Sequence, residues 1–387
     1  MPTDGQKAKT QALLPRRVLT PAGFESNRAV FVRGGTITDV VPAPNCPAGA
    51  SRRVLDGDLV PGFIDLQVNG GGGILFNDQP TVEGICAIAR AHRRFGTTGL
   101  MPTLISDDLH VIARAIAAVD EAIERGVPGI LGIHIEGPFL NPARKGIHDA
   151  AKIRALDDSA IALLSSLKRG RTLVTLAPEM VPAGAVRALV QRGVIVAGGH
   201  SDASAEQVQA ALAEGLAGFT HLFNAMSQLG SRAPGMVGAA LADERSWCGL
   251  IVDGHHAHPA ALRVALRAKG AGQLVLVSDA MPTVGSEVTV FQLGGRRITA
   301  ERGRCTDEAG TLAGSDLDMA SAVRNAEALM GVDLATAVQM ASEAPARALG
   351  LSDTHGAIRP GARADFVLLD ETRHAVESWI GGEAERA

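Results

Sequence analysis

Short apolar runs recur along the chain between Val60 and about residue 285, and amphipathic stretches separate them. Each run is mostly apolar and ends at Gly or a polar residue, a pattern typical of buried parallel strands. The predicted strands are 63–68, 100–104, 129–136, 172–176, 194–200, 218–221, 249–252 and 274–279, and the predicted helices include 111–125, 183–191, 205–214 and 259–268. This alternation predicts an α/β fold, a (β/α)8 TIM-type barrel whose active site lies at the C-terminal strand ends.

The pattern changes on both sides of this region. Residues 17–60 form short alternating runs, and two of them flank Gly34 and Gly35, which indicates a hairpin. Short runs return over 288–311, helical spacing follows over 317–330 and 334–349, and the last apolar run covers 364–369. We therefore expect a small discontinuous β-sandwich domain from the N- and C-terminal segments. The predicted boundaries are 1–59 and 356–387 for this domain and 60–355 for the barrel.

Composition removes several classes of function. A net charge of -4 and a pI near 6.3 provide no broad basic surface, so no nucleic-acid partner is expected. No stretch reaches the roughly 20 apolar residues of a membrane span, and the polar start lacks the apolar centre of a signal peptide. The four cysteines are scattered, which argues against a disulfide framework and favours a reducing compartment. A cytoplasmic protein is expected.

Four polar residues, Glu136, His200, His221 and Asp279, each follow an apolar run. If the runs are strands of one sheet, these side chains converge at its C-terminal edge. A single histidine at a strand end is more often structural than a ligand, but three such residues together favour a metal site. One carboxylate and two imidazoles leave a coordination position open for water, as catalytic zinc requires. Asp279 would then transfer protons, so the pattern predicts a metal-dependent hydrolase.

Further candidates lie in loops after the predicted strands. The segment 253–259 contains His255, His256 and His258, of which at most one ring is expected to point inward. Arg232 and the pair Arg144 and Lys145 offer charge for an anion, although solvated surface is the default interpretation for the pair.

Several motifs, in this order, resemble the N-acetylglucosamine-6-phosphate deacetylases of the amidohydrolase superfamily. They are PGFID at 61–65, HIEGPF at 134–139, GHS at 199–201, THLFNAM at 220–226, VSDA at 277–280, GTLAGS at 310–315 and PGARAD at 360–365. The resemblance covers the chain from about residue 30 onward. It implies hydrolysis of N-acetyl-D-glucosamine 6-phosphate to D-glucosamine 6-phosphate and acetate, in amino-sugar catabolism.

The resemblance also implies roles for individual residues. Metal-activated water would attack the acetyl carbonyl, with Asp279 as general base and then acid, while His256 polarises the carbonyl. The implied metal ligands are Glu136, His200 and His221, and the implied substrate contacts are Ile147, His148, Asn224, Ala225, Arg232, His256, Leu312, Ala313 and Gly314. Asn224, Ala225 and Arg232 would hold the phosphate, together with a basic residue from a partner subunit, which implies a homodimer.

One departure from the wider superfamily concerns the metal count. Most members carry His-x-His at the end of the first strand, where this chain has Gln67 and Asn69. Amides are poorer zinc ligands than imidazoles, so one divalent metal per chain is expected. Zn2+ is the favoured ion, with Fe2+, Mn2+ and Co2+ as alternatives.

Three alternatives stay open from the sequence. A deacetylase for the galactosamine epimer would differ by one hydroxyl configuration. A dihydroorotase-like or hydantoinase-like enzyme would need His-x-His and a carboxylated lysine, and no lysine ends the strand at 172–176. A non-catalytic sugar-phosphate sensor would be expected to lose Asp279 or a metal ligand, and this chain keeps them all.

Overall fold

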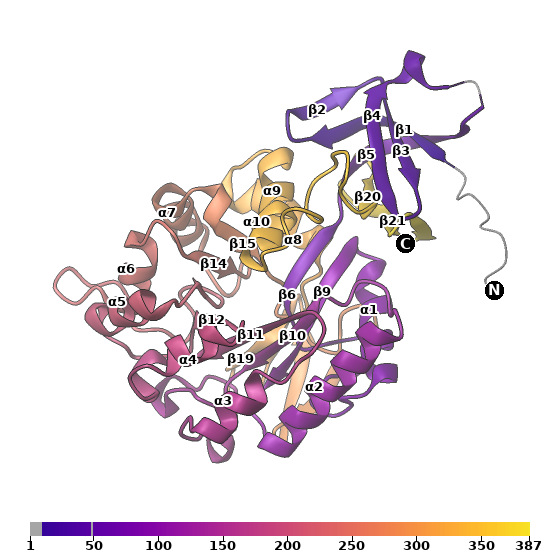
Figure 1. Ribbon diagram of the computed structural model, residues 1–387. Coiled ribbons are helices and arrows are strands. Elements are labelled where there is room, and N and C mark those ends of the chain that lie inside the picture. Colours follow the sequence, from indigo (N-terminus) through magenta and orange to yellow (C-terminus); the bar gives the residue numbers. More distant parts are fainter. Residues whose placement is uncertain (1–9, 48) are drawn as a thin grey trace.

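The computed structural model describes residues 10–47 and 49–387, which form a barrel and a separate sheet built from both ends of the chain (Figure 1). The barrel strands are β6 (Phe63–Val68), β9 (Thr97–Ile105), β10 (Gly132–Glu136), β11 (Arg171–Leu176), β12 (Ile195–Gly198), β13 (Gly218–Phe219), β14 (Trp247–Leu250) and β15 (Leu274–Leu276). They pair in parallel, in sequence order. A parallel bridge between Val68 and Ala280 closes the ring between β6 and the chain after β15. The predicted (β/α)8 barrel is confirmed.

Helices cover the outside of the barrel (Figure 1). They are α1 (Val82–Arg93), α2 (Leu109–Glu124), α3 (Asp158–Leu164), α4 (Ala185–Gln191), α5 (Ala205–Glu214), α6 (Gly235–Ala242), α7 (Pro259–Lys269), α8 (Met319–Asn325), α9 (Leu334–Ala341) and α10 (Glu343–Ala348), and a π-helical turn (Ala326–Met330) follows α8. Short 3-10 turns lie at Ala43–Asn45, Pro142–Arg144, Ala150–Lys152, Pro178–Met180 and Ala271–Gln273. Helix α5 begins at a capping box, in which Ser204 and Gln207 each bond the other's backbone N–H.

The prediction of one continuous helix over 334–349 is wrong. The chain breaks at Ser342, between α9 and α10, where φ is -134° and ψ is -67°. Pro345 has no backbone N–H, so it cannot continue the hydrogen-bond ladder of α9. The Ser342 hydroxyl instead donates to the carbonyl of Val338 at 2.6 Å and closes the end of α9. Strand β14 also begins two residues earlier than predicted, at Trp247.

The terminal sheet has eight strands. They are β1 (Gln11–Thr20), β2 (Gly23–Ser26), β3 (Arg28–Arg33), β4 (Thr36–Pro42), β5 (Ser51–Pro61), β20 (Phe366–Leu369), β21 (Ala375–Ile380) and β22 (Glu383–Arg386). Strand β20 pairs with β5, which brings the two ends of the chain together, and β3 and β4 form the predicted hairpin. Only Gly62 separates β5 from β6, so this sheet is tied directly to the first barrel strand.

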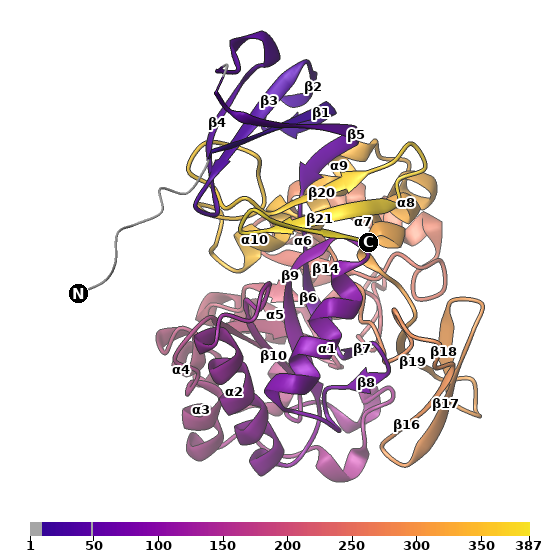
Figure 2. The ribbon, with the colours of Figure 1, turned by 90° about the vertical axis from the view of Figure 1, so that its right-hand side faces the viewer.

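A four-stranded antiparallel insertion lies beside the barrel (Figure 2). It consists of β16 (Val290–Leu293), β17 (Arg296–Glu301), β18 (Arg304–Thr306) and β19 (Leu312–Ser315), and a small hairpin of β7 (Gly70–Gly71) and β8 (Ile74–Leu75) follows β6. Buried Leu293 and Ile298 of the insertion pack in one cluster with Leu75, Ile105 and Ile147. The insertion therefore covers loops that leave the C-terminal ends of the barrel strands.

Candidate active site

A cavity of about 480 Å3 opens at the C-terminal ends of the barrel strands. Its lining consists of Asn69, Ile105, Glu136, Ala143, Arg144, Gly146, Ile147, His148, His200, His221, Asn224, Ala225, His256, Asp279, Met281, Gly310, Thr311, Leu312 and Gly314. All four residues that follow the apolar runs are therefore brought to one place. They are also nearly inaccessible, since Glu136 is 2% exposed and Asp279 is 8% exposed.

The backbone adopts a left-handed conformation at several of these residues, directly after the barrel strands end. His200, His221 and Asp279 have left-handed φ values of 48°, 33° and 53°, and Ala225 has a φ of 52°. Residues other than glycine rarely adopt this region, and each such residue costs about 1–3 kcal/mol. Such strained residues persist only where the surrounding packing holds their backbone in place, and they cluster at functional sites.

A glycine is required directly after Glu136. Gly137 has a φ of 86°, and a Cβ atom there would lie 2.3 Å from the Ser106 hydroxyl. The chain can therefore leave β10 past Ser106 only at a residue without a side chain.

Glu136, His200 and His221 converge on a single point. The Glu136 Oε1 lies 3.2 Å from His200 Nε2 and 3.0 Å from His221 Nε2, and the two Nε2 atoms are 3.1 Å apart. Ligand atoms bonded at 2.0–2.2 Å around a tetrahedral zinc ion lie roughly 3.3 Å from one another. The spacing of these three atoms therefore fits one face of a small metal site.

The protonation of His200 agrees with a ligand role. Its Nδ1 lies 2.9 Å from the Arg144 carbonyl oxygen, which can only accept, so Nδ1 carries the proton. In the neutral form of the ring Nε2 is then the unprotonated nitrogen, and it lies beside Glu136 and His221, where it could bind a metal. Burial opposes ionisation of Glu136, but the His200 and His221 rings outweigh it and hold the pKa of the Glu136 carboxyl well below its usual range. An ionised carboxylate and a neutral imidazole are the forms that bind metals.

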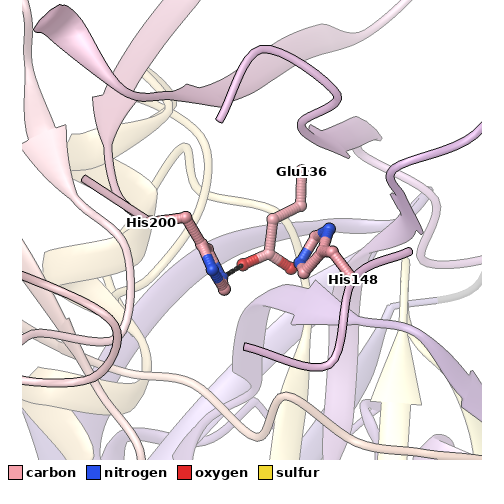
Figure 3. A group of neighbouring side chains, drawn as sticks. All are labelled: Glu136, His148 and His200. Carbon is pink, nitrogen blue, oxygen red and sulfur yellow. Dashed lines mark hydrogen bonds and ion pairs between the residues drawn. The ribbon is translucent and has the colours of Figure 1, made fainter. Parts of the chain in front are cut away.

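His148 lies on the other side of the Glu136 carboxylate from His200 (Figure 3). Glu136, His148 and His200 offer ligand atoms within 4.8 Å of one another, so they form a second, overlapping group that could hold a metal. The His148 Nδ1 accepts from the Ser106 backbone N–H at 3.3 Å and from its hydroxyl at 2.7 Å. Burial lowers the pKa of His148 to about 3, so the ring is neutral and its proton must be on Nε2. An N–H cannot ligate a metal, so His148 is better suited to donate a hydrogen bond.

Asp279 faces the same cavity from the closing seam of the barrel. Its Oδ1 accepts hydrogen bonds from Gln67 Nε2 at 3.0 Å and from Asn69 Nδ2 at 2.6 Å. Burial and the neighbouring Glu136 raise the pKa of the Asp279 carboxyl to about 6. A carboxyl group with a pKa near the working pH can both take up and release a proton.

Of the three histidines in 253–259, only His256 lines the cavity. Its Nδ1 lies 2.6 Å from Asp253 Oδ2, and two backbone N–H groups donate to Asp253 Oδ1. His255 is exposed and lies against the Arg302 carbonyl, while the His258 ring accepts from the first turn of α7. Asp253 was not singled out from the sequence, although a carboxylate three residues before a histidine is a usable signal.

The predicted substrate contacts fall into two groups. Ile147, His148, Asn224, Ala225, His256, Leu312 and Gly314 line the cavity. Ala313 is fully buried and Arg232 is exposed, and neither is part of the lining. The Arg144 side chain pairs with Asp202 at 2.7 Å, and it is the Arg144 carbonyl oxygen that contacts the His200 ring.

Comparisons with known proteins agree with this geometry. Residues 59–384 match the amidohydrolase family. The chain belongs to the amidohydrolase family. It is 44% identical to an N-acetylgalactosamine-6-phosphate deacetylase of Shewanella sp. (strain ANA-3), over 95% of this chain and 94% of that protein. It is 36% identical to the human N-acetylglucosamine-6-phosphate deacetylase, over 92% of this chain and 90% of that protein.

A solved structure of an N-acetylglucosamine-6-phosphate deacetylase from Pasteurella multocida superposes on this amidohydrolase with a TM-score of 0.94. The two chains are 30% identical, and the match covers 98% of this chain and 100% of the other. The resemblance seen in the motifs is therefore confirmed, as is the prediction of a hydrolytic enzyme. No helix in the described part of the chain has the length and apolar character needed to cross a membrane.

Proposed function

We propose that this amidohydrolase removes the acetyl group from an N-acetylated amino-sugar 6-phosphate, with N-acetyl-D-glucosamine 6-phosphate as the substrate expected from its motifs. The observation that supports it best is the meeting of Asp279 with the Glu136, His200 and His221 cluster in one cavity. Amide hydrolysis needs an activated water, a stabilised oxyanion and a proton for the amine, and these residues could provide all three functions together with a bound divalent cation and His256. A second candidate is N-acetyl-D-galactosamine 6-phosphate, because the 44% identical relative carries that name.

Glu136, His200 and His221 would hold the metal. A divalent cation bound there supplies Lewis acidity, which acidifies water and polarises a carbonyl oxygen. Asp279 removes a proton from the attacking water and delivers it to the sugar nitrogen as the C–N bond breaks, which releases acetate and the free amine. His256, when protonated and paired with Asp253, directs its Nε2–H at the carbonyl oxygen as negative charge develops there. His148 would donate its Nε2–H to the sugar.

The phosphate end of the substrate is assigned to Asn224 and the Ala225 backbone, which line the cavity beside His221. The exposed Arg232, outside the cavity lining, would also contact the phosphate. A basic residue of a partner subunit would complete the phosphate pocket in a homodimer. One zinc ion per chain and a cytoplasmic location also belong to the proposal. All four cysteines are free, which agrees with a reducing compartment.

The test of the proposed function is acetate release from both epimeric N-acetylated sugar 6-phosphates, with N-acetylglucosamine that lacks the phosphate as a control. Metal per chain is measured by mass spectrometry on the same sample, and size-exclusion chromatography with light scattering measures the subunit number. Turnover of one epimer with about one metal per chain is expected. Failure to release acetate from either phosphorylated sugar, with metal bound, would reject the proposal.

A further prediction concerns Asp253, whose carboxylate orients the His256 ring. Asp253→Asn keeps the shape of the side chain but removes the negative charge that faces the His256 Nδ1. Partners that orient a catalytic or metal-bound histidine typically contribute about 10–100-fold, so we expect kcat to fall by about that factor. Steady-state kinetics on metal-loaded protein measures it. His255→Gln, which alters an exposed ring outside the cavity, is the matched control; equal losses in both variants would contradict the role of Asp253.

A further inference from the structure

Two side-chain amides donate hydrogen bonds to the carboxylate of Asp279, the candidate general base. Gln67 is 2% exposed and Asn69 is fully buried; Gln67 lies near the C-terminal end of β6, and Asn69 directly follows this strand. Asn69 Nδ2 lies 2.6 Å from Asp279 Oδ1, and Gln67 Nε2 lies 3.0 Å from the same oxygen. Gln67 Nε2 is also 3.1 Å from Glu136 Oε2, so its two N–H groups connect the candidate base with a candidate metal ligand.

From this arrangement we propose that Gln67 and Asn69 are positioning residues, whose amide N–H groups fix Asp279 Oδ1 so that Oδ2 alone faces the reacting water. The proposal rests on the deacetylase function proposed above. In this role the two amides are more than weak metal ligands, because they set the direction in which the Asp279 carboxylate takes up and delivers its proton.

The distribution of bonds over the two carboxylate oxygens supports this role. Oδ1 accepts both side-chain bonds, whereas Oδ2 accepts none from the described residues, and Asp279 lines the cavity. A carboxylate fixed at one oxygen cannot rotate about its Cβ–Cγ bond without breaking two bonds to a charged group. Such bonds are worth about 1.5–3 kcal/mol each. The free oxygen therefore keeps one direction.

The backbone holds the donors and the acceptor in register. The Asp279 N–H donates to the Gln67 carbonyl at 2.9 Å, and the Asn69 and Gly70 N–H groups both donate to the Ala280 carbonyl at 2.9 Å. His92 of α1 lies 2.8 Å from the Gly70 carbonyl and supports the same turn. Because this seam closes the barrel, these backbone bonds fix how far the Gln67 and Asn69 backbone lies from that of Asp279.

Asn69→Leu is the decisive variant, because Leu keeps the shape of Asn69 and removes its N–H donors without touching Glu136. We expect kcat to fall about 10–100-fold, while KM stays within about threefold and the metal content equals that of the wild type. Asn69→Asp replaces the donor with a like charge and should lower kcat further than Leu does. Gln67→Met should lower kcat as well, and it should weaken metal binding because Gln67 also bonds Glu136.

Asn77→Leu is the matched control. The Asn77 amide also donates to a carboxylate, Asp107 Oδ2 at 3.0 Å, but lies outside the cavity lining. We expect it to lower the melting temperature and to leave kcat within about twofold of the wild type. If kcat falls equally in Asn77→Leu and Asn69→Leu, the loss is a general effect of destabilisation and the proposal is overturned.

A crystal structure of metal-loaded Asn69→Leu separates this proposal from the proposed function, because it needs no turnover. We expect the Asp279 carboxylate to leave its single orientation or to occupy more than one. An unmoved carboxylate, or a kcat within twofold of the wild type at full metal content, would overturn the positioning role. If the wild type deacetylates neither sugar phosphate, the proposed function fails, and the orientation of the carboxylate still decides the role of Asn69.

Discussion

Asp279→Asn is expected to lower kcat by roughly 10²–10⁴-fold, the range that a general acid–base catalyst contributes, without loss of the metal. Asn has nearly the same shape as Asp, so packing at the seam is kept. It cannot take up a proton from water or deliver one to the amine. The Glu136, His200 and His221 cluster is untouched, so metal per chain should equal that of the wild type. Initial rates with the better of the two sugar phosphates, together with metal analysis, measure both quantities.

Asp243→Asn is the matched control for this prediction. Asp243 accepts backbone N–H groups of Arg245 and Ser246 in the turn before β14, at the opposite end of the barrel from the cavity. The amide oxygen can still accept those bonds, so kcat should change by less than about twofold. A wild-type rate in metal-loaded Asp279→Asn would remove Asp279 from the reaction, and equal losses of rate and metal would make it a ligand instead.

The barrel could be predicted from the sequence because the pattern that marks a buried strand is local. A strand buried on both faces must be apolar along its length, and the first polar residue after it marks the strand end. Glu136 is the last residue of β10, and His200, His221 and Asp279 follow within three residues of the ends of β12, β13 and β15. The structure brings all four to one cavity. Closure of the sheet into a ring then brings the ends of distant strands together, so an alternation of runs along the chain predicts a cluster in space.

The orientation of the histidine rings in the cavity could not be predicted from the sequence. Left-handed backbone at His200 and His221 is imposed by packing, and no local pattern predicts it for a histidine. The tautomers of His148 and His200 depend on Ser106 and on the Arg144 carbonyl, which are distant in sequence and reach the rings only in the folded chain. The task of Gln67 and Asn69 also depends on a contact more than 200 residues away, across the seam.

Metal binding should discriminate between the two overlapping groups around Glu136. His221→Gln is expected to raise the metal dissociation constant by more than the roughly 10–100-fold that loss of an outer partner costs, because it removes a direct ligand. His148→Gln should change that constant by less than about tenfold, because the protonated Nε2 of His148 cannot bind a metal. Competition with a chelator of known affinity measures both constants. The two substitutions are matched, since each replaces one buried imidazole of the same cavity with the same neutral amide.

Thermal unfolding provides a second measurement that needs no substrate. A ligand at 1,000 times its dissociation constant stabilises the folded state by about 4 kcal/mol, so added metal should raise the melting temperature of the metal-free wild type and of His148→Gln. The same addition should stabilise metal-free His221→Gln much less, by at most about a third of the wild-type gain if the dissociation constant rises 100-fold or more. The opposite ranking, with His148→Gln unresponsive to metal, would transfer the site to Glu136, His148 and His200. Since Ser106 donates to the His148 Nδ1, that outcome would require the ring to leave Ser106 or to lose its remaining proton when the metal binds.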